Sequence, residues 1–128
     1  DKLKEYLKRS ADPLEGIWTL YGSTLEDTLL RMGGDYRLAL VRNGNGYDII
    51  YISGAAVGRD RWQRGMIKGH LEATDFGGVY CLVWYDAEMK RMAHDLKAQT
   101  EEFSNVLRLY FPYQDSSVVL RKVTPSAE

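Results

Sequence analysis

The sequence predicts a mainly β fold, an antiparallel meander that closes as a sandwich or a barrel. Three observations lead to this class. Eight segments rich in β-branched, aromatic and aliphatic residues follow one another between residues 16 and 123. Apart from one insertion they recur roughly every 12 residues, with Gly- and Asn-containing turns between them. No helical pattern follows each strand, which argues against a parallel βαβ winding.

Residues 1–11 predict a short amphipathic helix. Leu3, Tyr6 and Leu7 recur at helical spacing among charged residues. Asp12 ends the helix, because a residue that precedes proline is pushed out of the helical region. The first strand is then expected over residues 16–21.

Residues 23–34 predict a second helix, in the first long loop. Ser23 and Glu26 have the spacing of a capping box, in which each side chain satisfies a free backbone amide. Gly33 stands where a left-handed C-terminal cap is favoured. The first and second strands are therefore separated by a helical insertion.

From residue 36 onward the pattern is strand and turn. The run Asn43-Gly44-Asn45-Gly46 predicts a tight hairpin, since Asn and Gly tolerate positive φ. Alternation within residues 62–74 places Ile67 and Leu71 on one face and Lys68 on the other. Residues 90–100 fit a helix as well as a strand. The seven further strands are expected at 36–42, 47–53, 62–74, 79–85, 90–100, 105–111 and 118–123.

Composition limits the class of protein. A length of 128 residues suits one domain, expected over residues 1–128 with its β structure over 14–123. With 45% hydrophobic and 27% charged residues, the chain is expected to fold around a core. The 17 basic and 18 acidic residues give a net charge of -1, which argues against nucleic-acid binding. No apolar run reaches the ~20 residues of a membrane span, and one cysteine excludes an internal disulfide.

The two ends of the sequence give expectations about processing. The chain starts at Asp1 without the pattern of a signal peptide, so we expect a mature form or a piece of a longer protein. Residues 124–128 are polar and predict a frayed tail or a linker.

The run Gly16-Ile17-Trp18, preceded by a short helix, resembles the Gly-x-Trp signature of the lipocalins and the wider calycin group. The resemblance covers residues 14–123, mostly by pattern. It implies an antiparallel up-and-down barrel of eight strands, with Trp18 at its closed end and Arg121 of the last strand lying over it. We expect the N-terminal helix to close one end and the 23–34 helix to cover the open mouth.

A second resemblance is to β-rich domains appended to exported bacterial proteins, some of them proteases. The segments that carry it are 12–18, 36–39 and 50–55. It implies a non-catalytic accessory domain in the periplasm or outside the cell. A single cysteine suits any compartment, so it does not decide the location.

Two functions follow from the barrel. The first is non-catalytic binding of a hydrophobic or amphipathic small molecule inside it, with the 23–34 helix as a lid. The second is a filled accessory domain that meets a protein partner, or a parent catalytic domain, through surface aromatics and the loop with Arg59, Arg61 and Arg64. A large interior cavity favours the first, and a packed interior the second. Alternation with Trp18 inward gives the expected ligand-lining residues, which are Tyr36, Leu38, Leu40, Tyr51, Tyr80, Trp84 and Arg108.

The sequence predicts no catalytic residue, metal site or cofactor. His70 and His94 lack the spacing of zinc ligands. Cys81 lies in the most apolar strand and is expected to be a buried small hydrophobe rather than a reactive thiol. An enzyme would need His94 or Asp95 in a cavity beside another group with a shifted pKa.

Overall fold

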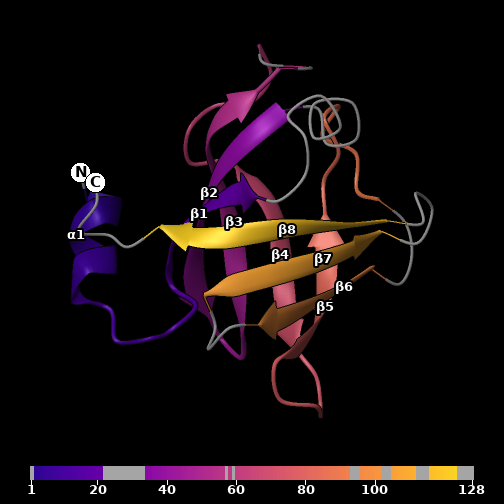
Figure 1. Ribbon diagram of the computed structural model, residues 1–128. Coiled ribbons are helices and arrows are strands. Elements are labelled where there is room, and N and C mark those ends of the chain that lie inside the picture. The colour runs from indigo at the N-terminus through magenta and orange to yellow at the C-terminus, as the bar shows by residue number, and fades with distance from the viewer. Residues whose placement is uncertain are drawn as a thin grey trace.

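The computed structural model describes residues 2–21, 34–56, 58, 60–92, 96–101, 105–111 and 116–123. Neighbouring strands pair antiparallel in sequence order, and the last strand pairs with the first, so the sheet is a closed barrel (Figure 1). Its elements are α1 (Lys2–Arg9), β1 (Gly16–Tyr21), β2 (Gly34–Asn43), β3 (Gly46–Ala55), β4 (Ile67–Ala73), β5 (Val79–Trp84), β6 (Leu96–Glu101), β7 (Val106–Phe111) and β8 (Ser116–Val123).

The predicted eight-stranded antiparallel barrel with a short N-terminal helix is confirmed. Strand β4 begins at Ile67 rather than at residue 62, because a turn that contains Gly65 at φ 99° precedes it. Of the two alternatives for residues 90–100, a helix or a strand, the structure has the strand, over residues 96–101. The predicted helix at 23–34 lies outside the described residues except for Gly34, which begins β2, and the tail at 124–128 also lies outside them.

Alternating side chains fill the inside of the barrel. In β2, Leu38 and Leu40 point inward, and opposite them on β3 lie Tyr51 and Ile49. Trp18 is fully buried opposite Leu38. The other fully or almost fully buried residues of this interior cluster include Leu71, Leu82, Trp84, Leu96, Ala98, Leu107, Leu109, Phe111 and Leu120.

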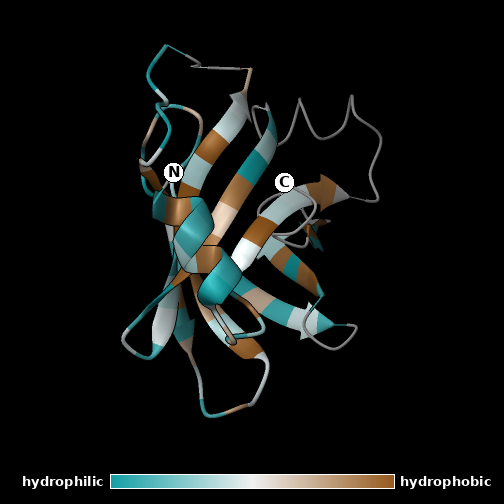
Figure 2. Ribbon diagram, turned by 90° about the vertical axis from the view of Figure 1, so that its left-hand side faces the viewer, coloured by the Kyte–Doolittle hydropathy of each residue, from teal (hydrophilic) through white to brown (hydrophobic). Residues whose placement is uncertain are grey.

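Helix α1 packs on the outer wall of the barrel and does not close its end. Its one buried residue, Leu7, joins a separate apolar cluster with Ile17, Ala39 and Ile52, which point outward from β1, β2 and β3. Figure 2 shows the helix in front of the barrel wall. The expectation that the helix closes one end is therefore wrong, because its apolar stripe is matched by outward-facing aliphatic residues.

The turn after α1 closes the barrel instead. Leu14 is buried and belongs to the interior cluster. The end at which Leu14 lies is the closed end, and the end at which β2, β4, β6 and β8 begin is the loop end. No helix in the described part of the chain is long and apolar enough to cross a membrane.

Candidate functional site

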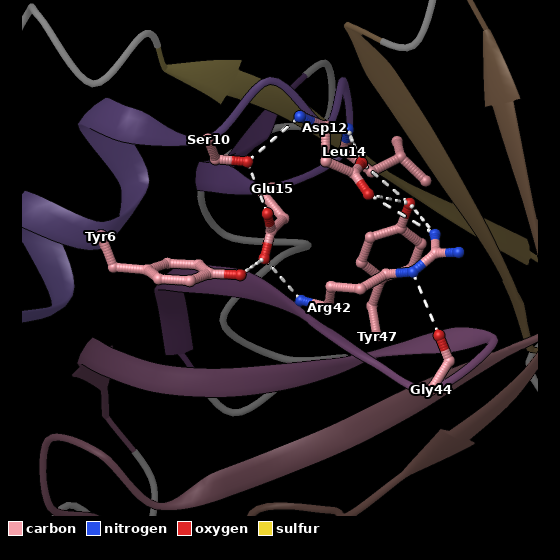
Figure 3. A network of polar contacts seen from close by, with 8 residues as sticks. All are labelled: Tyr6, Ser10, Asp12, Leu14, Glu15, Arg42, Gly44 and Tyr47. Atoms are coloured by element: carbon pink, nitrogen blue, oxygen red, sulfur yellow. Dashed lines mark hydrogen bonds and ion pairs between the residues drawn. The ribbon is translucent and has the colours of Figure 1, made fainter.

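At the closed end, a buried carboxylate ties the helix to the barrel. Glu15 accepts hydrogen bonds from the hydroxyls of Tyr6 and Ser10 and from the backbone N–H of Arg42 at 2.7 Å (Figure 3). Burial alone would raise the pKa of Glu15, but these three donors together outweigh it and hold the pKa below its ordinary value. Glu15 is thus a satisfied anion that connects α1, the turn and β2.

The Asp12 carboxylate also has donors for its oxygen atoms. It accepts from the Tyr47 hydroxyl at 2.8 Å and from the Leu14 N–H at 2.9 Å, and it forms an ion pair with Arg42 at 3.4 Å. Burial and the hydrogen bond to Asp12 raise the pKa of Tyr47 to about 12. A groove of about 420 Å³ between α1 and the turn passes over this network. Because the carboxylates of Glu15 and Asp12 already have donors, we interpret the groove as a structural junction.

The Gly-x-Trp motif lies at the closed end, and the basic residue beside Trp18 is not the expected one. The Trp18 indole N–H donates to the Leu14 carbonyl at 3.0 Å. Lys122, not Arg121, lies opposite Trp18, and its Nζ donates to the Pro13 carbonyl at 2.7 Å. Arg121 lies opposite Thr19 and is exposed, because neighbouring strand residues point to opposite faces.

The stem of Lys122 passes over Gly16. A Cβ at Gly16 would lie 2.6 Å from the Cε of Lys122. The glycine of the motif therefore leaves the space in which this lysine crosses the first strand.

The loop end holds a buried lysine, which breaks the predicted alternation at the start of β4. The pairs Ile49↔Gly69 and Ile50↔Ile67 leave Lys68 as the extra residue of a β-bulge. The bulge turns the Lys68 side chain inward, where it is 0% exposed, while Ile67 is 38% exposed. Simple alternation fails here because one extra residue changes the face of the positions next to it.

Three aromatic rings surround the Lys68 amine. Its Nζ lies 4.2 Å from the ring centroid of Trp62, 4.6 Å from that of Tyr36 and 5.0 Å from that of Trp84. It donates one hydrogen bond, to the Tyr85 carbonyl at 2.6 Å. We call Tyr36, Trp62 and Trp84 the aromatic cage.

Other contacts hold the cage in place. Tyr51 meets the rings of Tyr36 and Trp62, and Phe111 meets the ring of Trp84 edge-on. The Trp62 indole N–H donates to the Ala87 carbonyl at 3.0 Å, which fixes the segment before β4 against the one after β5. The amine is therefore enclosed by aromatic side chains that also contact one another.

Burial dominates the electrostatics of this amine. It lowers the pKa of Lys68 to about 7, and the negative charge of Asp86 opposes the shift only in part. Among the described residues, no carboxylate lies within ion-pair distance of Nζ. Burial also raises the pKa of Tyr36 to about 12, so this cage residue stays a neutral phenol near pH 7. The lysine consequently exchanges a proton near neutrality.

A surface pocket borders the cage from outside. It has a volume of about 320 Å³ and is lined by Trp62, Ile67, His70, Tyr85 and Met89. Two of these residues, Trp62 and Tyr85, also contact the Lys68 amine. We call this cavity the Trp62 pocket.

The floor and rim of the Trp62 pocket combine polar and apolar groups. His70 Nδ1 lies 2.7 Å from an Asp48 carboxylate oxygen, and its ring meets Tyr85 edge-on. Met89 has a positive φ of 69° in a turn whose backbone N–H groups bind Asp86. Ile67 and Met89 expose apolar surface at the rim.

Six of the seven expected lining residues lie inside the barrel. Tyr36, Tyr51 and Trp84 gather around Lys68 or beside its cage. Leu38 and Leu40 fill the middle of the barrel, and Tyr80 packs toward the closed end against Tyr47.

Arg108 lies on the outer face and does not line the interior. It stands between inward-facing Leu107 and Leu109 and pairs with Glu101 at 2.7 Å. Alternation therefore places it outside.

The other sequence candidates do not join the site. Cys81 is exposed, contrary to the expectation of a buried thiol, because Leu82 and Trp84 occupy the inward positions of β5. Arg61 and Arg64 are exposed. No group of three or more potential metal ligands occurs in the described ranges. Arg59, His94 and Asp95 lie outside the described residues, so the enzyme hypothesis has no described geometry.

Sequence reasoning missed Lys68, although one signal pointed to it. Gly69 interrupts a strand pattern, which is typical of a bulge or of close backbone approach. A Cβ at Gly69 would lie 2.3 Å from the Val83 carbonyl oxygen, so the backbones of β4 and β5 need this glycine. The residue next to such a glycine cannot be assigned to a face by alternation.

The fold and the site define a closed eight-stranded antiparallel barrel with a buried lysine amine in an aromatic cage. Comparison of the chain with protein-family models, with curated proteins and with solved structures gives no match.

Proposed function

We propose that this chain is a lipocalin-like binding barrel for a small amphipathic molecule with an acidic head group. The head group meets the Lys68 amine, and the apolar body occupies the Trp62 pocket. The observation that carries the proposal is a fully buried amine without a carboxylate partner among the described residues.

Electrostatics supports an acidic ligand. Burying a charge without a counter-charge is unfavourable, and Lys68 responds with a pKa lowered to about 7. A ligand carboxylate beside Nζ would favour the protonated amine and raise this pKa again. Ligand binding is then coupled to the uptake of a proton by the lysine.

The shape and lining of the pocket support an amphipathic ligand. A volume of about 320 Å³ is at the lower end of the range for small-molecule sites. Its apolar walls include Ile67 and Met89, and the indole of Trp62 connects it to the cage. Buried aromatic and aliphatic side chains point into the barrel interior toward the closed end, which favours the Trp62 pocket as the place of the apolar body.

The test is calorimetric titration with octanoate and with 1-octanol, a neutral ligand of the same chain length. Octanoate should bind once per chain. Above pH 7 its affinity should fall about tenfold per pH unit, since the amine then loses its proton. Of the titratable residues around the amine, Tyr36 faces it with its ring, Tyr85 accepts its hydrogen bond through the backbone carbonyl, and Asp86 acts on it through its charge.

Variants separate the head-group contact from the pocket. Lys68→Met should weaken octanoate binding at least tenfold and leave octanol binding unchanged. Lys90→Met removes an exposed lysine from the neighbouring turn and serves as the matched control. Equal octanoate affinity in the wild type and in Lys68→Met would contradict the proposal.

A second candidate function is an accessory domain that binds a protein. The many buried aromatic and aliphatic side chains of the interior favour it, because a barrel with a packed core can act through its surface alone. If neither octanoate nor octanol binds the folded chain, this second function becomes the preferred one.

A further inference from the structure

We propose that the Lys68 amine also captures small apolar aldehydes, as a reversible imine formed through the Trp62 pocket. This inference deepens the proposed function, because it concerns the same site and names a second class of ligand. It rests on the position of the amine, on the pocket beside it and on the nature of the walls.

The amine and the pocket share two walls. The Trp62 ring centroid lies 4.2 Å from Nζ, and the Tyr85 carbonyl oxygen lies 2.6 Å from it. Both residues also line the pocket. The Trp62 indole stands between the pocket and the amine, so its displacement, with loss of the hydrogen bond to Ala87, would open the pocket to the amine.

The amine has the chemistry of a nucleophile. A lysine loses its proton when desolvated in an apolar site, which frees the nitrogen lone pair. The lowered pKa of Lys68 agrees with this. Its protein partners are one carbonyl oxygen and three ring faces, none of which blocks the lone pair by donating a hydrogen bond.

The reaction balances without an oxidant or a reductant. The neutral nitrogen attacks the carbonyl carbon, a C–N bond forms, and the carbonyl π electrons pass to the oxygen. The two protons of the amine move to that oxygen, which leaves as water while the C=N bond forms. His70, which lines the pocket and is hydrogen bonded to Asp48, can relay these protons.

The pocket selects aldehydes with an apolar body. Aromatic and aliphatic side chains dominate its walls, and its size suits a single ring or a short chain. Exclusion of water from the cage also favours the imine, since hydrolysis reverses its formation.

The experiment treats the folded chain at pH 7 with benzaldehyde and sodium cyanoborohydride, which reduces the imine to a stable benzylamine. Peptide mass mapping then gives the extent of modification at each lysine. Lys90, with an exposed side chain in the next turn, is the internal control.

Lys68 should be modified at least ten times faster than Lys90. Ile67→Trp, which fills the pocket from its rim, should slow the modification of Lys68 about tenfold and leave Lys90 unchanged. Excess octanoate should protect Lys68 alone. Circular dichroism confirms that the variant is folded, and Met89→Trp provides a second way to fill the pocket.

The two proposals fail separately. If octanoate binds but Lys68 is modified no faster than Lys90, the imine proposal is wrong and the proposed function stands. If Lys68 is modified selectively but octanoate does not bind, the imine proposal is supported and the acidic ligand is wrong.

Discussion

The two ends of the barrel differ in the partners that they give to a charged side chain. At the closed end, Glu15 receives three hydrogen bonds and Asp12 is bound by Tyr47, Leu14 and Arg42. At the loop end, Lys68 is more deeply buried than either carboxylate, yet its partners are one carbonyl oxygen and three aromatic rings.

This contrast separates structural charge from functional charge. The Glu15 carboxylate, with its three donors in place, holds α1 and the turn against β2 and needs no ligand to compensate its charge. A buried amine without a counter-charge reduces stability, and such groups are common at binding and catalytic sites. The difference between the ends is the reason that we propose Lys68 as the functional site.

The largest effect is expected at the closed end. Trp18→Ala removes a fully buried indole and its hydrogen bond to Leu14, and it should lower the free energy of unfolding by about 3–5 kcal/mol. Urea denaturation measures this loss. A change near zero would contradict the position of Trp18 as a central residue of the closed end.

The next effect concerns Lys68 and pH. Its pKa is about 7 in the folded chain and 10.5 as the ordinary value, so the unfolded chain binds more protons between these values. Stability should therefore rise with pH, by about 2 kcal/mol from pH 7 to pH 9. Lys68→Met should lack this rise and be at least as stable as the wild type at pH 7.

Denaturation of both proteins at the two pH values gives the comparison. Lys90→Met should retain the wild-type rise. An identical pH dependence in Lys68→Met and the wild type would show that the amine is not buried as a costly charge.

A smaller loss is expected when the Glu15 carboxylate is made neutral. Glu15→Gln replaces an acceptor of three hydrogen bonds with an amide and should lower stability by about 1–2 kcal/mol at pH 7. Glu5→Gln, on the exposed side of α1, is the control and should change little. Equal stability of the two variants would contradict the role of Glu15 in connecting α1, the turn and β2.

The smallest effect is the acid dependence of the same carboxylate. Because hydrogen bonds hold the pKa of Glu15 below 4.5, its stabilisation is fully present above that pH and is lost as the pH falls through the folded-state pKa. The wild type should lose more stability than Glu15→Gln between pH 5 and pH 2. Parallel acid-denaturation curves would contradict this.

Much of the fold could be predicted because it depends on local patterns. Alternation and turn residues located all eight strands, and the Asn-Gly run located the β2–β3 hairpin. The same patterns placed Tyr36, Tyr51 and Trp84 inside the barrel. These residues lie in regular strand segments, where the period of two holds.

The rest depended on features that no local period records. A bulge placed Lys68 in the interior together with Leu71, although alternation put the two on opposite faces, and the register of β8 against β1 gave Lys122 the position expected for Arg121. The Trp62 pocket joins a turn to the ends of two strands, so only the three-dimensional arrangement brings its residues together.

The most direct measurement is the titration of the Lys68 amine itself. NMR of the chain with ¹³C-labelled lysine follows each Cε shift with pH, and the Lys68 signal is the one missing in Lys68→Met. We predict a midpoint near pH 7 without ligand and an upward shift of at least about one unit with saturating octanoate. A midpoint near 10.5, or one near 7 that octanoate leaves unchanged, would contradict the assignment of the loop end as an acid-binding site.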